Sequence, residues 1–355
     1  MNFHSKPHIF HNREKSSSYF LKTFNDSNIL KVDTIESQLK ELAIIENPKL
    51  KAEFSENDKL FKRYLDDKNI DSYGNWIYYP WLNTMVRLLE KNDFIKVRTS
   101  RNQYKILPEE QNKLSESTIG IVGLSVGQSV AKTIALERIA GKIVIADFDT
   151  IDLSNLNRIQ AGLNNLGLPK TIITARKISE IDPYIEVVCY NEGITHQNIN
   201  DFYAEKLDLI IDECDEINIK ILLRQKARKN TLPLLMDTSD RGMLDVERYD
   251  LNNSYPLFHG KVSEKTLEKC LAGSLTKPEV VDVVSEIIDK KTMSEELKYS
   301  MSEIGKTINT WPQLGSDVTL GGAITAMMSR EILLNKTNYS GRVFFDFKEK
   351  IANNE

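Results

Sequence analysis

The chain has 355 residues, of which 41% are hydrophobic and 28% are charged, and its net charge is −4 at pH 7. This length predicts about two domains, and the acidic balance argues against a nucleic-acid-binding surface. No apolar run reaches the ~18 residues that span a membrane, no signal-peptide pattern opens the chain, and the three cysteines do not suggest disulfides. We therefore expect a cytoplasmic protein with no membrane and no nucleic-acid partner.

The N-terminal part of the chain is expected to stand apart from the rest. Residues 1–30 are polar and include a run of serines, which predicts a flexible tail or arm. In residues 31–97, the apolar side chains of Ile35, Leu39 and Leu42 share one helix face. A small and mostly helical module is therefore predicted for this segment.

Residues 119–147 have the pattern of a nucleotide-binding unit. An apolar strand at 119–122 runs into a glycine turn, a helix at 126–139, and a second strand at 143–146 that ends in Asp147. This order is the first half of a dinucleotide-type fold, in which a helix N-terminus offers free N–H groups to a phosphate. The separation of the turn from Asp147 is close to the ~20 residues typical of an acid that binds a ribose hydroxyl.

The glycine turn itself reads GLSVG at residues 123–127. A strict dinucleotide fingerprint would have glycine in place of Ser125 and Gln128. Serine is small enough to let the backbone approach a ligand closely. We therefore expect Gly123, Ser125 and Gly127 to bind the nucleotide.

The same five residues match the G-x-S-x-G nucleophile elbow of serine hydrolases. Such an enzyme would need an acid and a histidine after Ser125, and the histidines downstream are His196 and His259. The elbow normally follows several core strands, and residues 1–115 predict no such series. A serine hydrolase stays open as an alternative function.

Amide and cationic side chains follow Asp147 at short intervals. Asn155 and Arg158 lie in the motif Ser-Asn-Leu-Asn-Arg, and Lys170 comes shortly afterwards. A triphosphate needs such a set, whereas hydride transfer does not. The pattern therefore favours ATP over NAD, with an NAD-dependent oxidoreductase as a disfavoured alternative.

Two further side chains are candidates for chemistry. Asp215 follows an apolar strand at 207–211, at the carboxyl edge of the sheet where ligands bind. Cys270 lies on a predicted helix at 264–271 among charged neighbours, which suits an accessible and nucleophilic thiol. Packing within the protein is the alternative role for Cys270.

The remaining apolar pattern predicts an α/β core over residues 98–355. The expected elements are, in chain order, a helix at 168–181, strands at 186–190, 207–212, 232–236 and 243–248, a helical insertion at 251–313, a helix at 314–334, and a strand at 342–347.

Several motifs of residues 98–250 occur together in one known family. The segments RTSRNQYK, IGIVG, DFDTIDLSNLNR, GLPK and LIIDECDE resemble the ThiF/MoeB/HesA superfamily of ubiquitin-activating-type adenylyltransferases. The resemblance implies a Rossmann-like ThiF/MoeB adenylation fold with a mainly parallel sheet. A closer similarity is to bacterial ThiF-domain proteins that are often fused to a nitroreductase-like domain, which implies a nitroreductase-like partner.

The resemblance also implies how ATP is held. Asn155 and Arg158 match the pair that binds the β- and γ-phosphates, and Lys170 matches the lysine that neutralises the triphosphate. Arg101 matches an arginine that reaches the phosphates across the interface of a homodimer.

Two acids complete the site that the resemblance implies. Asp147 matches the ribose acid, and Asp215 matches the acid that places Mg²⁺ near the α-phosphate. The sequence departs from the family where Glu216 follows Asp215 in place of asparagine. It also has no Cys-x-x-Cys pair, so no structural zinc is expected.

The implied chemistry is Mg·ATP-dependent adenylation of a substrate carboxylate, with release of pyrophosphate. The expected acceptor is the C-terminus of a peptide or of a small ubiquitin-like or sulfur-carrier protein. A small acid, or a peptide in natural-product tailoring, is the alternative acceptor. A non-catalytic nucleotide-binding scaffold is the alternative function.

Overall fold

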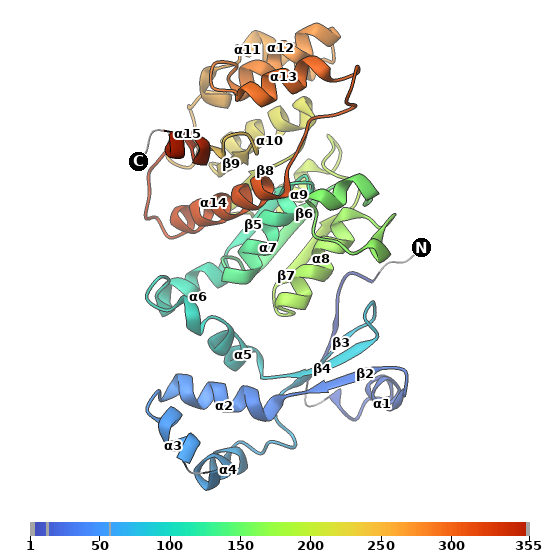
Figure 1. Ribbon diagram of the computed structural model, residues 1–355, viewed down its shortest axis with the longest axis vertical. Coiled ribbons are helices and arrows are strands. Elements are labelled where there is room, and N and C mark those ends of the chain that lie inside the picture. The colour runs from blue at the N-terminus through green and yellow to red at the C-terminus, as the bar shows by residue number, and fades with distance from the viewer. Residues whose placement is uncertain (1–3, 12–13, 57, 353–355) are drawn as a thin grey trace. The chain divides into compact units, whose positions relative to one another are not determined.

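The computed structural model describes residues 4–11, 14–56 and 58–352 (Figure 1). The chain divides into two compact units, and each is described by itself. The first consists of Met1–Glu109 and Ser179–Tyr184, and the second of Glu110–Ile178 and Ile185–Glu355.

The first unit contains a four-stranded sheet of strand order β1-β3-β4-β2. Only the β2–β4 pair is parallel. Its elements are β1 (His8–Phe10), α1 (Ser18–Asn25), β2 (Leu30–Asp33), α2 (Ile35–Glu46), α3 (Leu50–Glu56), α4 (Asp58–Asp67), β3 (Asn75–Tyr79), β4 (Thr84–Leu88), α5 (Lys91–Arg98) and the 3₁₀ helix η2 (Ser100–Asn102).

This sheet differs from the tail and helical module expected for residues 1–97. Strand β1 and helix α1 pack their apolar side chains against β3 and β4, where Trp76 and Met85 are buried. The strands β3 and β4 form a hairpin whose turn includes Asn83 at a positive φ of 49°. Burial alternates along β4, but its buried positions are Met85 and Arg87, so the sequence has no apolar and polar alternation that would predict this strand.

The second unit is built on a seven-stranded sheet of order β11-β10-β9-β8-β5-β6-β7. The strands from β7 to β9 are parallel, and β10 and β11 add antiparallel pairs at one edge. This topology agrees with the predicted, mainly parallel Rossmann-like sheet. The strands are β5 (Thr118–Val122), β6 (Lys142–Ala146), β7 (Glu186–Tyr190), β8 (Leu209–Asp212), β9 (Pro233–Asp237), β10 (Met243–Arg248) and β11 (Gly341–Phe344).

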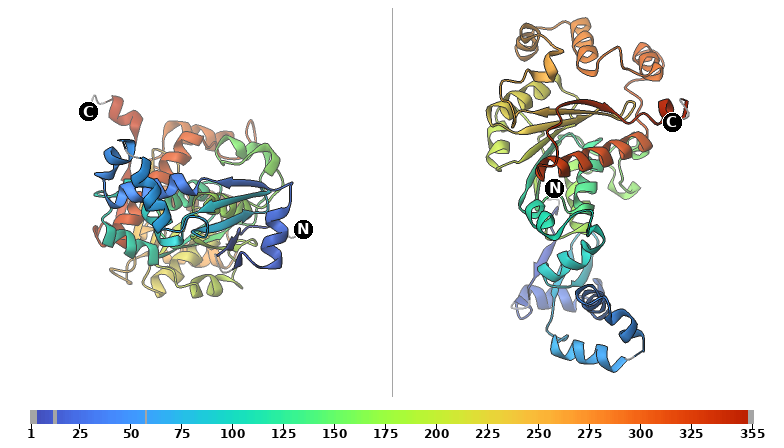
Figure 2. Two further views of the ribbon diagram at one scale, coloured as in Figure 1. Left: turned by 90° about the horizontal axis from the view of Figure 1, so that it is seen from below. Right: turned by 90° about the vertical axis from the view of Figure 1, so that its left-hand side faces the viewer.

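Helices cover both faces of this sheet (Figures 1 and 2). On one face α14 packs along α7 and against β9 and β10, and on the other an apolar cluster joins the strands to α9, α10 and α11. The helices are α6 (Pro108–Glu116), α7 (Gly127–Glu137), α8 (Lys170–Ile181), α9 (Ile199–Ala204), α10 (Ile217–Lys229), α11 (Glu264–Leu271), α12 (Lys277–Ile288), α13 (Glu295–Glu303), α14 (Gly315–Leu333) and α15 (Phe347–Ala352), with 3₁₀ helices η3 (Leu153–Asn157), η4 (Leu163–Asn165) and η5 (Leu257–Gly260). Among the described residues, no helix is both long and apolar enough to cross a membrane.

A buried ionic network ties α10 to two strands. Arg224 donates to Asp212 at the end of β8 and to Glu247 in β10, with an Nε–Oε2 distance of 2.5 Å to Glu247, and all three side chains are fully buried. Burial would raise the pKa of Asp212, but the positive charges of Lys220 and Arg224 outweigh it and hold that pKa below its usual value. Removing one partner of such a network leaves a buried charge unpaired, which typically costs about 3–5 kcal/mol.

The contact between α14 and α7 depends on small residues. A Cβ atom added at Gly322 would lie 2.3 Å from the hydroxyl oxygen and 2.8 Å from the Cβ of Ser129 on α7. Because both helices lie against the sheet, α14 has little room to move away from α7. We therefore treat Gly322 as a close-packing position and not as a flexible one.

We expect Gly322→Ala to lower the free energy of unfolding by about 1–3 kcal/mol, since the new methyl group overpacks the interface. Chemical denaturation measures this change. Ala323→Ser, on the exposed side of α14, is the control and should change stability by less than about 0.5 kcal/mol. Adding Ser129→Gly to Gly322→Ala should recover part of the loss, and no recovery would contradict the packing argument.

Candidate functional site

The glycine turn crosses directly over the segment that follows β8. Gly123 has a φ of +89°, and a Cβ there would lie 2.4 Å from the carbonyl oxygen of Glu213. The backbone N–H of Glu213 also donates to the carbonyl of Val122 at 2.7 Å. Only glycine satisfies both the positive φ and the close approach, so Gly123 brings the ends of β5 and β8 together.

Asp147 fixes the conformation of this turn. Its carboxylate accepts hydrogen bonds from the N–H of Leu124 at 2.6 Å and from the N–H of Asp149 at 2.8 Å. Burial raises the pKa of Asp147, while the charge of Lys170 and the two N–H donors oppose the shift. The side chain therefore has a structural task in the loop, and its contact with a ribose hydroxyl stays a prediction.

Ser125 and Arg158 are in direct contact. The Nε–H of Arg158 donates to the hydroxyl oxygen of Ser125 at 2.9 Å, and its NH1 group donates to the side chain of Asn157 at 2.9 Å. Burial lowers the pKa of Arg158, and the negative charge of Asp215 counters that shift. The structure thus brings Ser125, Arg158 and Asp215 into one electrostatic neighbourhood, although they are far apart in the sequence.

Asn155 and Lys170 are both engaged within the segment between β6 and α8. The side-chain oxygen of Asn155 accepts from the N–H of Asp152 at 3.0 Å and so caps η3. The ammonium of Lys170 donates to Asp149 at 2.6 Å. Their predicted contacts with phosphate would require Lys170 to exchange this partner, and both roles stay predictions.

Gln313 is a residue of this neighbourhood that the sequence did not reveal. Its backbone carbonyl accepts from the amide of Asn157 at 2.6 Å, and its side chain accepts from the hydroxyl of Ser125 at 3.4 Å. Gly315 follows at the start of α14, where a Cβ would lie 2.8 Å from the carbonyl oxygen of Asn157. The segment before α14 therefore closes onto the glycine turn.

Arg101 and Cys270 are the two remaining predicted residues. Arg101 belongs to η2 of the first unit, where it is exposed. Cys270 is buried on α11 within the apolar cluster, and burial raises the pKa of its thiol. These surroundings disfavour the thiolate that a nucleophile needs, so the structure gives Cys270 a packing position.

No catalytic triad forms around Ser125 in the described chain. Its hydroxyl meets Arg158 and Gln313, whereas the ring of His259 contacts Asp245 at 2.5 Å and the hydroxyl of Tyr255 at 3.1 Å. A serine nucleophile needs a base within hydrogen-bond reach. The elbow-like motif therefore places Ser125 next to an arginine and a glutamine, and neither supplies the base that a serine hydrolase needs.

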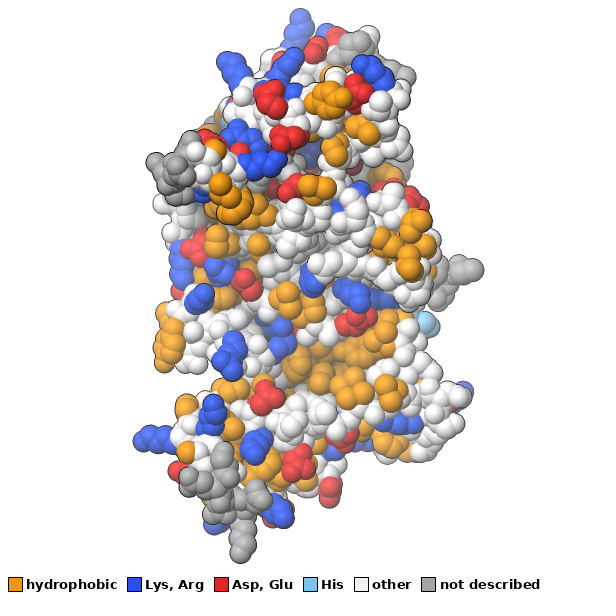
Figure 3. Space-filling view, viewed as in Figure 1, with side chains coloured by type: hydrophobic (Ala, Val, Ile, Leu, Met, Phe, Trp, Pro, Cys, Tyr) orange, Lys and Arg blue, Asp and Glu red, His pale blue; other side chains and the backbone are white. Residues whose placement is uncertain are grey.

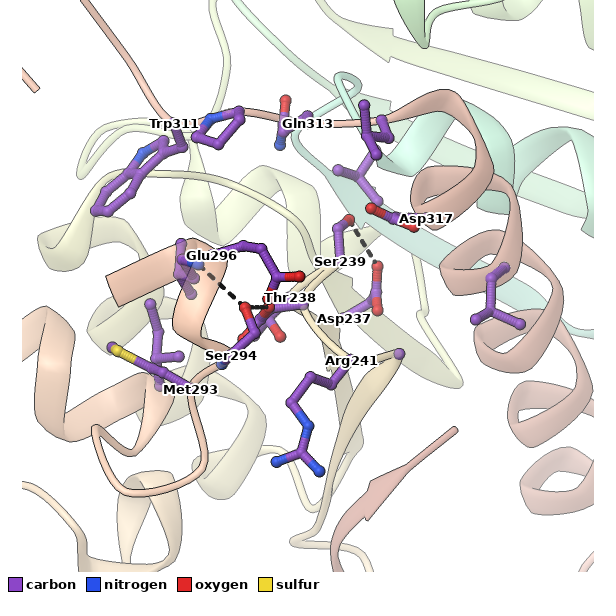
Figure 4. Close-up of a pocket in the computed structure, with 18 of the residues that line it drawn as sticks. Asp237, Thr238, Ser239, Arg241, Met293, Ser294, Glu296, Trp311, Gln313 and Asp317 are labelled. Carbon is purple, nitrogen blue, oxygen red and sulfur yellow. Dashed lines mark hydrogen bonds between the residues drawn. The ribbon is translucent and has the colours of Figure 1, made fainter. Parts of the chain in front are cut away.

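A chamber of about 930 Å³ opens beside these residues. Ser125 and Asp215 line it, together with the turn between β9 and β10, the start of α13, the segment 311–314 and α15. In Figure 4 the labelled side chains from these elements face a common space, with Trp311 and Gln313 on one side and Asp237 and Arg241 on the other. The size suits a small ligand or the end of a peptide.

Asp215 could contribute one ligand to a magnesium ion whose other ligands come mainly from a bound nucleotide. Among the described residues, no group of three His, Cys, Asp or Glu side chains comes together as a metal site. Mg²⁺ in nucleotide enzymes commonly uses one or two carboxylates plus phosphate oxygens and water. The exposed carboxylate of Asp215, at the carboxyl edge of the sheet, suits that role.

The chain is similar in sequence to several known proteins. The chain is 41% identical over 281 residues to the uncharacterised protein MT1398 of Mycobacterium tuberculosis, covering 79% of this chain but only 39% of that protein. It is 24% identical to a tRNA threonylcarbamoyladenosine dehydratase of Bacillus subtilis, covering 67% of this chain and 96% of the relative. It is also 24% identical to a molybdopterin-synthase adenylyltransferase of Haemophilus influenzae, covering 56% and 82%.

A solved structure supports the fold. The tRNA threonylcarbamoyladenosine dehydratase of Escherichia coli, in complex with AMP, superposes with a TM-score of 0.50 at 18% identity, covering 67% of this chain and 95% of that one. The predicted enzyme class, an ATP-dependent adenylyltransferase, is one that occurs among these relatives. Residues 99–331 match the ThiF family, and the chain belongs to that family.

Proposed function

We propose that this protein uses Mg·ATP to adenylate a substrate carboxylate. The observation that carries the proposal is the convergence of Ser125, Arg158 and Asp215 beside one chamber. A cation and a carboxylate at the end of a glycine turn suit a magnesium-bound triphosphate better than they suit a nicotinamide. Family membership supports the same reaction class.

In the proposed reaction, a carboxylate oxygen of the acceptor attacks the α-phosphorus of ATP. A new P–O bond forms, the bond between the α-phosphorus and the bridging oxygen breaks, and pyrophosphate leaves with that electron pair. No general base is required, because a carboxylic acid is already ionised at pH 7. Bound Mg²⁺ would supply charge neutralisation for the phosphates.

The residues of this chain would act by positioning and by electrostatics. Asp147 holds the turn that includes Leu124, so the free N–H groups of the α7 N-terminus point to a fixed position. Arg158 would stabilise the charge that builds up on the leaving pyrophosphate. Asp215 would hold the magnesium ion, and the chamber would hold the acceptor.

We further propose that two copies of the chain form the active unit. If Arg101 serves the triphosphate of a second copy, that copy must lie close to the phosphate-binding segment. Leu153, Leu163 and Leu166 on and beside η3 and η4 are exposed, at 66%, 68% and 41% of their surface. Hydrophobic side chains gather over this segment in Figure 3. An exposed apolar patch next to a site is typical of an interface.

The acceptor is proposed as the C-terminal carboxylate of a peptide or of a small carrier protein. The molybdopterin-synthase adenylyltransferases among the relatives act by name on a protein, which supports this class. A nitroreductase-like partner remains a proposal as well. Because the chain spans 39% of the length of MT1398, the activity of the longer protein is not defined by this chain.

Arg158→Ala should weaken ATP binding by about 10-fold or more, because a charged hydrogen bond to phosphate typically contributes ~1.5–3 kcal/mol. AMP lacks the β- and γ-phosphates, so its affinity should change by less than about 3-fold. Calorimetric titration with both nucleotides measures the difference. Lys132→Ala, which removes a basic residue on α7, is the control and should leave the ratio of the ATP and AMP affinities unchanged. An equal loss of affinity for AMP and ATP would show that Arg158 stabilises the glycine turn and does not bind the β- and γ-phosphates.

Leu163→Glu should convert a dimer into monomers, since a charge on the exposed apolar patch opposes its burial. Sedimentation measures the oligomeric state, and Leu251→Glu at another exposed leucine is the control. The monomeric variant should lose ATP affinity to the same extent as Arg101→Ala, and the double variant should lose no more. Full ATP affinity in a monomer would contradict a role of Arg101 across the interface.

A further inference from the structure

The chamber has an excess of negative charge. Of the described residues that line it, nine are acidic and three are basic. Figure 3 shows charged side chains of both signs around α13 and α15, two helices that contribute to the lining. The three basic side chains already form ion pairs with acidic residues, so the net charge of the lining is negative.

Each basic side chain of the lining has acidic partners of its own. Arg241 contacts Asp346 and Glu349, both at 2.5 Å. The other two pairs are Lys348 with Glu296 at 2.6 Å and Lys220 with Asp212 at 3.2 Å. The positive charge available to a ligand inside the chamber is therefore small, and a second anionic group on the acceptor would be poorly held.

Asp237 is the most informative member of the lining. It ends β9, is only 5% exposed, and forms no ion pair with a described lysine, arginine or histidine. One of its oxygens accepts from the hydroxyl of Ser239 at 3.2 Å, and the other has no hydrogen-bond partner. A buried carboxylate without a cation is costly. Burial raises the pKa of Asp237 to about 6, although hydrogen bonds from Ser239 and from the backbone N–H of Thr238 oppose the rise.

The fold makes room for this carboxylate. A Cβ at Gly321 of α14 would lie 2.0 Å from an oxygen of Asp237. Glycine inside a helix costs about 1 kcal/mol relative to alanine, so α14 is weakened at the position that accommodates Asp237. The negative charge of Asp317, also on α14 and also in the lining, acts on Asp237. Two carboxylates from different elements thus face one region of the chamber (Figure 4).

The pair suits an organic cation, because two carboxylates match the charge and the N–H donors of an ammonium or a guanidinium group. Trp311 and Met293 lie across the chamber (Figure 4). An aromatic ring and a thioether suit the methylene stem and the cationic head of an organic ligand.

We propose that the acceptor carries a cationic group, an ammonium or a guanidinium, which binds between Asp237 and Asp317 while its carboxylate faces the nucleotide site. The substrate class is therefore a carboxylic acid with a basic side chain, such as a peptide that ends in arginine or lysine. This inference rests on the proposed adenylation for the role of the carboxylate, but not for the binding of the cation.

Two probes test the cation directly. Acetyl-Gly-Gly-Arg with a free C-terminal carboxylate should bind at least 10-fold more tightly than acetyl-Gly-Gly-citrulline, which has nearly the same shape without the charge. Calorimetry of the full chain with Mg²⁺ and a non-hydrolysable ATP analogue measures both affinities. Equal affinities, or no binding of either peptide, would overturn the inference.

The variants Asp237→Asn and Asp317→Asn should each reduce the preference for arginine, and together they should abolish it. Glu295→Gln, another acid of the lining that pairs with Lys298 at 2.7 Å, is the matched control and should keep the preference. Asp237→Asn should also raise the melting temperature at pH 7.5, because it removes an unpaired buried charge. A preference that survives in the double variant would contradict the assignment, as would a folded Asp237→Asn protein with a lower melting temperature.

The nucleotide titration separates this inference from the proposed function. Normal Mg²⁺-dependent ATP binding with no preference for arginine would defeat the cationic acceptor alone. A preference for arginine in a protein that binds no ATP would defeat adenylation and keep the cation site. If the protein both binds ATP and prefers arginine, the arginine peptide should support ATP–pyrophosphate exchange. The citrulline peptide should not support it at the same concentration.

Discussion

The crossing of the glycine turn over the backbone after β8 is the constraint on which the site depends. A side chain at Gly123 would collide with the carbonyl of Glu213, so the two strand ends meet only because this residue has no Cβ. The order β8-β5-β6 then sets Asp215, Ser125 and Asp147 along one edge of the sheet. The arrangement of these three residues is thus a consequence of strand order and of one close contact.

The buried charges have two different roles in the second unit. Asp212, Arg224 and Glu247 satisfy one another and bind α10 to the sheet. Asp237 has no comparable partner, although it ends the neighbouring strand. A network that is complete without a ligand serves the fold, whereas an incomplete one beside a chamber is typical of a functional site. This contrast is the physical reason to look for a cation at Asp237.

The sequence predicted the second unit well because its signals are local. Apolar runs and the glycine turn placed the strands from β5 to β10 within a few residues. Phosphate binding by the motif at 154–158 stays a prediction. The sheet of the first unit was missed because its four strands are short, and because helices separate β1, β2 and the β3–β4 hairpin along the chain. Gln313, Asp237 and Asp317 were missed because their importance depends on which distant elements meet at the chamber. Cys270 had suggestive neighbours in sequence, but three-dimensional packing buries it.

The most direct test of adenylation is the effect of Mg²⁺ on ATP affinity in the natural protein and in Asp215→Asn. If Asp215 places the metal, Mg²⁺ should strengthen ATP binding in the natural protein by about 10-fold or more and should have little effect in the variant. Affinity without Mg²⁺ should be similar in both proteins. An equal effect of Mg²⁺ on the two proteins, or binding of NAD in place of ATP, would contradict the account.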